Sequence, residues 1–158
     1  MAIIKGGSKA PVFSLPTQDG KKASLGDFKG RWVVLYFYPK DNTPGCTIEA
    51  KDFTALAGKF EKLGAVVLGV SPDGVASHCK FIEKQGLKIT LLSDSEKDAA
   101  KKYGAWGMKT SFGKTGEGLI RSTFLISPDG KIAKAWNGVK AKGHAEAVLE
   151  VFRSLRSA

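Results

Sequence analysis

Residues 31–38 read RWVVLYFY, a continuous run of β-branched and aromatic side chains without polar alternation. This run predicts a strand buried on both faces, because a strand with one solvated face alternates apolar and polar residues. Loop-forming residues follow at 39–45, reading PKDNTPG, and apolar residues then recur at helical spacing from Cys46 to Leu63. We therefore expect a strand, a loop and a helix, with Cys46 in the first turn of the helix.

The alternation of strand and helix continues along the chain. We expect a strand at 65–70, a helix that starts at residues 71–73 and runs to Gly86, and a short strand at 90–92. The remaining expected elements are a helix capped by Asp94 or Ser95 that runs through Tyr103, strands at 122–126 and 132–136 joined by a turn at 128–131, and a helix from about His144.

The segment before the first strand predicts smaller elements. The turn at 18–21 indicates a short hairpin, and residues 24–28 indicate at most one helical turn. Together the elements predict the α/β class, with a central mixed β-sheet flanked by helices and an N-terminal β-hairpin. The length of 158 residues, without an internal repeat or linker, predicts a single domain over 1–158.

The cysteine count and the lack of long apolar runs indicate a cellular compartment. No run approaches the roughly 18–20 apolar residues of a membrane span, and the first residues lack the apolar stretch of a secretory signal. We expect a cytoplasmic protein without membrane contact. A reducing cytosol leaves thiols free for chemistry, so Cys46 and Cys79 are expected to be free rather than joined in a structural disulfide.

The formal net charge is +10, which is high for this length. Such a charge is compatible with an anionic partner, and a binding or chaperone-like protein is one alternative function. The lysines, however, are scattered singly or in pairs, with no run of five or more. This pattern favours a solvated basic surface and no specific nucleic-acid site.

Cys46 is the candidate nucleophile. A cysteine reacts as its thiolate, and the unpaired N–H groups at a helix N-terminus lower the pKa of a thiol placed there. A free cysteine is also a frequent apolar filler of a core. The polar residues on both sides, at 41–45 and at Thr47 and Glu49, favour the reactive interpretation.

Residues 38–49, reading YPKDNTPGCTIE, resemble the peroxiredoxins, in the subgroup called bacterioferritin comigratory protein or peroxiredoxin Q. The resemblance extends over nearly the whole chain and includes residues 69–73, 91–94, 113–114 and 121–126. It implies a thioredoxin-like fold and a thiol-dependent peroxidase, an antioxidant oxidoreductase that reduces hydrogen peroxide and organic hydroperoxides.

The resemblance also implies a role for each residue of the site. Cys46 attacks the O–O bond and becomes sulfenic acid, while Thr43 and the Cys46 backbone N–H donate hydrogen bonds to the peroxide oxygens and the thiolate. Pro39 shields the thiolate. Arg121 brings a permanent positive charge beside it, and Glu49, one helical turn after Cys46, orients Arg121.

The second cysteine departs from a common family pattern. Many members place it five residues after the first, a position that Lys51 occupies in this chain. Cys79 is the remaining candidate, in the later helix where other members place theirs about one turn further on, near Ile82. Because a disulfide needs Cα atoms about 5.5–6 Å apart, we expect local unwinding before Cys79 resolves Cys46.

The resemblance implies that thioredoxin reduces the resulting disulfide, with glutaredoxin or another thiol as alternatives, and that the protein is a monomer. The alternative is a one-cysteine peroxidase that uses an external thiol. A thiol–disulfide oxidoreductase is disfavoured, because that chemistry uses a Cys-x-x-Cys pair and Glu49 occupies the third position after Cys46.

The sequence indicates no cofactor. His78 and His144 are far apart, lack a metal-ligand spacing and are expected to be solvated. The three tryptophans are expected in the core or at its edge. No glycine-rich phosphate loop follows a strand, so we expect no metal, haem, flavin or nucleotide.

Overall fold

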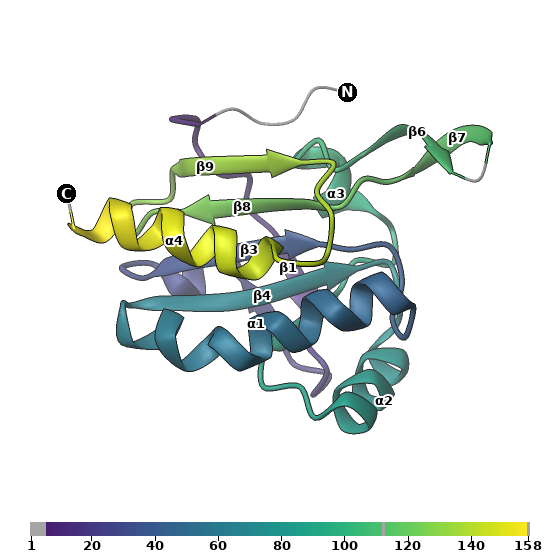
Figure 1. Cartoon of the computed structure of the whole chain (residues 1–158), viewed down its shortest axis with the longest axis horizontal. Coiled ribbons are helices and arrows are strands. Elements are labelled where there is room, and N and C mark those ends of the chain that lie inside the picture. The colour runs from purple at the N-terminus through teal and green to yellow at the C-terminus, as the bar shows by residue number, and fades with distance from the viewer. Residues whose placement is uncertain (1–5, 112, 158) are drawn as a thin grey trace.

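The computed structural model describes residues 6–111 and 113–157. Its centre is a five-stranded mixed sheet with strand order β5-β4-β3-β8-β9 (Figure 1). The strands are β3 (Trp32–Phe37), β4 (Ala65–Ser71), β5 (Thr90–Ser93), β8 (Ser122–Ile126) and β9 (Ile132–Asn137). β3, β4 and β5 run parallel, whereas β8 is antiparallel to β3 and β9 is antiparallel to β8. The expected α/β class with a central mixed sheet is confirmed.

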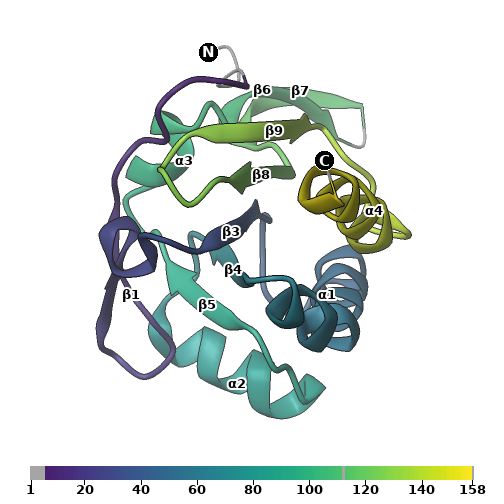
Figure 2. The same ribbon diagram turned by 90° about the vertical axis from the view of Figure 1, so that its left-hand side faces the viewer.

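Helices cover both faces of the sheet. They are α1 (Pro44–Lys62), α2 (Val75–Gln85), α3 (Asp98–Lys102) and α4 (His144–Ser157). α1 and α4 lie on one side of the sheet, and α3 lies on the other beside the N-terminal segment (Figure 2). One core cluster combines Phe53 of α1, Phe81 of α2 and Phe152 of α4, so these three helices share a core. Tyr103 and Phe13 belong to the second cluster, on the opposite face.

The strand before α1 is buried as its composition predicts. Residues 33–38 are all buried, which confirms that β3 has apolar contacts on both faces. α1 begins at Pro44, so Cys46 is its third residue and lies in the first turn as expected. Within residues 6–111 and 113–157, no helix has both the length and the apolar character to cross a bilayer.

The N-terminal hairpin is also confirmed. β1 (Ser14–Pro16) pairs antiparallel with β2 (Lys22–Ser24), and one 3-10 turn, η1 (Leu25–Phe28), follows. The turn of the hairpin contacts the central sheet through a bridge between Thr17 and Leu92 of β5, and the Gln18 carbonyl accepts from Cys79 of α2. It therefore lies close to α2 and β5.

Two features differ from the sequence expectation. A hairpin of β6 (Trp106–Ser111) and β7 (Lys114–Leu119) projects from the body of the molecule (Figure 1), and no strand was expected there. Residues 113–117 are exposed, so the apolar alternation that signals a strand is missing. α3 is shorter than expected and begins at Asp98, although the Asp94 carboxylate still accepts from the Ala99 and Ala100 N–H groups at 3.2 and 2.9 Å.

Candidate active site

The sheet brings two distant segments together at the carboxyl end of β3. Phe37, the last residue of β3, pairs with Ser122, the first residue of the antiparallel β8. The loop that leaves β3 and the residue that precedes β8, Arg121, therefore lie at the same edge of the sheet. Reactive groups gather at such strand ends in α/β proteins, because the loops there are free of sheet pairing.

Cys46 lies where this loop becomes α1. Thr43 is the N-cap residue in an extended conformation, Pro44 occupies the first helical position, and the Thr47 N–H donates to the Thr43 carbonyl at 2.9 Å. Cys46 is only 1% exposed. The free N–H groups and the dipole at the start of a helix favour a negative charge, so a thiolate at Cys46 is stabilised by its position.

Arg121 bridges Cys46 and Glu49. Its Nη2 atom donates to Cys46 Sγ at 3.3 Å, and its Nη1 atom donates to Glu49 Oε1 at 2.5 Å. The Arg121 side chain is 16% exposed and that of Glu49 is fully buried. A planar guanidinium held at two points keeps its charge in a defined place, which a flexible ammonium group cannot do.

Glu49 is in an unusual electrostatic environment. Burial raises its pKa to about 7, although the charge of Arg121 and the hydrogen bond from it pull the pKa down. Its Oε2 atom is one of two buried side-chain oxygens in the described part of the chain without a hydrogen-bond partner, the other being the Tyr36 hydroxyl. Burial and the Arg121 charge therefore act on the pKa of Glu49 in opposite directions.

Gly45 allows Arg121 to lie close to the helix start. A Cβ atom at this position would be 3.2 Å from Arg121 Nη2, tighter than an ordinary van der Waals contact. The close contact that disfavours a larger residue here comes from a side chain 76 positions away in the sequence. No local pattern signals this requirement, so Gly45 was absent from the expected site.

Pro39 and Thr43 lie in the loop that leads to Cys46. Pro39 is half-buried and directly follows the buried Tyr38. The Thr43 hydroxyl donates to the Lys40 carbonyl at 2.9 Å, which closes the loop on itself. The expected donation from Thr43 to a peroxide would replace this contact, and it stays a prediction.

The expectation that His78 and His144 are solvated is wrong. His78 is fully buried and His144 is 6% exposed. His144 Nε2 lies 2.7 Å from the Thr123 hydroxyl, which holds the start of α4 against β8. Burial and the nearby charge of Arg121 lower the pKa of His144 to about 4. Each histidine has a buried polar partner, which a single sequence does not reveal.

His78 belongs to a group of contacts around Asp41. The Asp41 carboxylate accepts hydrogen bonds from the Tyr38 hydroxyl at 2.6 Å, the Ser77 hydroxyl at 2.7 Å and His78 Nδ1 at 2.8 Å. We call Asp41, Ser77 and His78 the Asp41 cluster. It connects the loop between β3 and α1 with the first turn of α2.

Cys79 is the one expected site residue that contacts a different part of the molecule. It is exposed, and its Sγ atom donates to the Gln18 carbonyl at 2.8 Å, in the turn between β1 and β2. Cys46 and Cys79 are both free thiols in this structure. The structure brings Cys46, Glu49 and Arg121 into contact and places Pro39 and Thr43 in the loop that leads to Cys46, whereas the Cys79 thiol faces the hairpin.

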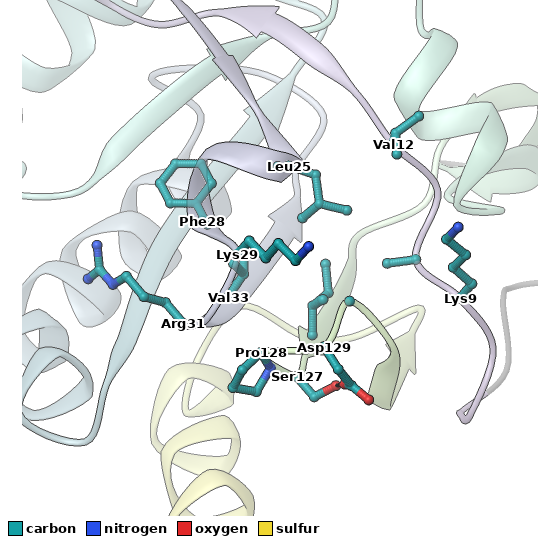
Figure 3. Close-up of a pocket in the computed structure, with 14 residues that line it drawn as sticks. Lys9, Val12, Leu25, Phe28, Lys29, Arg31, Val33, Ser127, Pro128 and Asp129 are labelled. Carbon is teal, nitrogen blue, oxygen red and sulfur yellow. Dashed lines mark hydrogen bonds between the residues drawn. The ribbon is translucent and has the colours of Figure 1, made fainter.

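A hollow of about 410 Å³ lies at the other end of β3 (Figure 3). Leu25, Phe28 and Val33 are among the residues that line it, together with Lys29 and the turn at 127–130. None of the residues Pro39, Thr43, Cys46, Glu49 and Arg121 lines this hollow. In residues 6–111 and 113–157, no group of three or more His, Cys, Asp or Glu side chains is arranged to hold a metal ion.

Relatives and solved structures resemble the chain over almost its whole length. The AhpC/TSA family model matches residues 6–135. The chain is 53% identical over 150 residues to a putative peroxiredoxin bcp of Helicobacter pylori, covering 95% of this chain and 99% of that protein. It is 45% identical to peroxiredoxin Bcp of Bacillus subtilis, covering 96% and 97%. The structure of the bacterioferritin comigratory protein of Xanthomonas campestris aligns with a TM-score of 0.89 at 40% identity, covering 96% and 99%.

Proposed function

The chain belongs to the AhpC/TSA family of peroxiredoxins and is a thiol-dependent peroxidase, and from this premise we propose that Cys46 is the residue that attacks the peroxide. The single observation that carries the assignment is the fork of Arg121, which donates to Cys46 Sγ at 3.3 Å and to Glu49 Oε1 at 2.5 Å. A fixed guanidinium favours the thiolate before the reaction and the negative charge on oxygen during it.

In the first step the Cys46 thiolate attacks the terminal oxygen of the peroxide. An S–O bond forms, the O–O bond breaks, and the leaving oxygen departs as hydroxide or alkoxide that takes a proton from water. Cys46 becomes sulfenic acid. Arg121 stabilises the leaving oxygen, and the Thr43 hydroxyl and the Cys46 N–H orient the peroxide, with Pro39 limiting access of water.

We expect the substrates to be hydrogen peroxide and small organic hydroperoxides. The related Xanthomonas campestris protein is described with an alkyl peroxide reduction activity, and this chain is 40% identical to it over 96% of its length. The near-complete burial of Cys46 is consistent with a small reactive group at the sulfur, with the rest of the substrate outside.

The second step regenerates the thiol. We propose that Cys79 attacks the sulfenic sulfur of Cys46, forming a disulfide and releasing water, and that thioredoxin then reduces the disulfide in the cytoplasm. Glutaredoxin or another thiol is the alternative reductant, and we expect a monomer. The contact between Cys79 and Gln18 must break before Cys79 can reach Cys46. The alternative is a one-cysteine cycle in which an external thiol reduces Cys46.

The test is a count of thiols after the addition of one equivalent of hydrogen peroxide to the fully reduced protein. Cys46→Ser and Cys79→Ser are treated in parallel, and any disulfide is mapped by mass spectrometry. We expect both thiols to disappear into a Cys46–Cys79 bond, and Cys79→Ser to accumulate sulfenic or sulfinic Cys46. Oxidation of Cys46 with Cys79 left free would support the one-cysteine cycle. No reaction at Cys46 would refute the assignment.

A further inference from the structure

α2 begins without a capping side chain. Its N-cap residue is Gly74, and no side chain caps the free N–H groups of the first turn. The His78 N–H donates to the Gly74 carbonyl at 3.1 Å, within the helix itself. The side-chain bonds from Ser77 and His78 to Asp41 do not cap these N–H groups, but they attach the first turn of α2 to the loop before α1.

Asp41 is well suited to anchor this turn because it is charged and buried. Burial tends to raise its pKa, but the hydrogen bonds from His78, Tyr38 and Ser77 outweigh burial and leave the pKa below its usual value. His78 Nε2 lies 3.0 Å from the Leu92 carbonyl, so the ring is held between Asp41 and β5. Hydrogen bonds to a buried charge are stronger than those between neutral groups.

The orientation of α2 keeps the Cys79 thiol away from Cys46. Neighbouring residues on an α-helix are rotated by about 100° about its axis. With His78 turned inward to Asp41 and Leu92, Cys79 is turned to Gln18 at the surface. A disulfide needs Cα atoms about 5.5–6 Å apart and Cβ atoms that point at each other. The first turn of α2 must rotate or unwind to meet this geometry, and that movement breaks the bonds to Asp41.

We propose that the Asp41 cluster controls how fast Cys79 reaches Cys46, by holding the first turn of α2 in its closed position. This inference rests on the proposed resolving role of Cys79. Ser77 and His78 are then positioning residues for the second step, and they touch neither the peroxide nor the sulfur of Cys46.

The cluster also decides between two fates of the sulfenic acid. In one, the Cys79 thiol displaces the sulfenic oxygen, an S–S bond forms and water leaves. In the other, a second peroxide transfers an oxygen to the sulfenic sulfur, which gives sulfinic acid and water or an alcohol. Opening of α2 precedes only the first reaction. A weaker cluster therefore shifts the product towards the disulfide.

Ser77→Ala tests the cluster, because the effect of the lost bond opposes the effect of helix propensity. Alanine is the better helix former, so propensity alone predicts a firmer α2. Loss of the hydroxyl bond to Asp41 predicts the reverse, with hydrogen exchange in residues 75–85 of the reduced protein about five- to tenfold faster. His78→Gln is the second variant. Lys80→Ala, at an exposed position of the same helix, is the matched control.

The same proteins are then oxidised with one equivalent of hydrogen peroxide, and the rates of sulfenic acid and disulfide formation are followed separately. We expect Ser77→Ala to form the Cys46–Cys79 disulfide about five- to tenfold faster and to give less sulfinic acid under excess peroxide. The rate of the first oxidation should stay within about twofold of the parent, since a single surface-side hydroxyl is removed outside the fork of Arg121. A purely structural defect would slow both steps.

Unchanged or slower exchange in Ser77→Ala and His78→Gln would overturn the proposal, as would faster exchange without faster disulfide formation. Failure of the parent protein to form the disulfide would instead refute Cys79 as the resolving residue. Hydrogen exchange does not depend on the redox cycle, so it still decides whether the cluster holds α2.

Discussion

At the scale of single residues, the site depends on how closely the Arg121 guanidinium approaches the start of α1. The fork spans Cys46 and Glu49, which are one helical turn apart on α1. Because Gly45 has no side chain, Nη2 of Arg121 can lie close to the start of α1. The Arg121 guanidinium is therefore positioned by a close contact with the start of the helix.

We predict that Gly45→Ala slows the reaction of Cys46 with hydrogen peroxide by about tenfold to a hundredfold, because the new methyl group displaces Nη2 from Sγ. The measurement is the second-order rate of thiol oxidation in rapid mixing. Gly58→Ala is the control, since Gly58 lies in the same helix with nothing within 4 Å of an added Cβ. It should raise the free energy of unfolding by about 0.5–1 kcal/mol without changing the rate. Equal rates for both variants would contradict the prediction.

Glu49 gives the site a pH dependence. Its pKa of about 7 in the folded protein means that the carboxylate loses its charge, and its hold on Arg121, as the pH falls through 7. We expect the oxidation rate per thiolate to fall over this range, with the thiolate fraction measured independently by ultraviolet absorbance. In Glu49→Gln the rate should be lower at pH 8 and should lack this titration.

The same shift affects stability in the opposite direction. The pKa is raised from 4.5 to about 7, so the contribution of Glu49 to the free energy of unfolding is fully present below pH 4.5 and is lost as the pH rises through 7. The free energy of unfolding, measured in urea, should fall less between pH 4 and pH 8 in Glu49→Gln than in the parent protein. A parallel pair of curves would contradict the prediction, because it would show that folding leaves the pKa of Glu49 unchanged.

At the scale of elements, the docking of α4 onto β8 includes a buried histidine. His144 opens α4 and lies against Thr123 of β8, with Trp136 of β9 stacked edge-on at 5.8 Å between ring centres. Val148 and Phe152 of α4 complete the contact with the core. A neutral imidazole fits this contact, because burial and the charge of Arg121 both disfavour the protonated ring.

We predict that docking of α4 weakens in acid. The pKa of His144 falls from 6.5 to about 4 on folding, so its contribution to stability is present above pH 6.5 and is lost as the pH drops towards 4. His144→Asn should be less stable than the parent at pH 7, with the difference shrinking at pH 4.5. Urea unfolding at pH 7 and pH 4.5 measures this difference in the free energy of unfolding. A difference that grows in acid would contradict the assignment of a neutral His144.

The elements themselves were mostly predictable. The apolar runs of β3 and β4, and the periodicity of α1, depend on nearest neighbours in the sequence and were confirmed. The β6–β7 hairpin was missed because its exposed strands carry no buried face. α3 was predicted too long, since Lys97 adopts a left-handed conformation, with φ of 59°, that delays the helix to Asp98.

At the scale of the whole molecule, the sheet register creates the site. Arg121 and Cys46 are 75 positions apart and meet because β8 begins beside the end of β3. Asp41 and His78, 37 positions apart, meet because α2 follows β4 on the same face as α1. Asp41 lies in the loop after β3 and Cys46 in the first turn of α1, so both contacts join this segment to a later element.

The sequence by itself determined the α/β class, the strand-loop-helix order around Cys46 and the family resemblance, because these depend on local composition and spacing. Only the tertiary structure decided that Arg121 donates to both Cys46 and Glu49. It also decided that His78 is buried against Asp41 and that Cys79 contacts Gln18. These contacts depend on strand register and on the rotation of each helix about its axis. Packing of the whole core sets both, and no single segment encodes them.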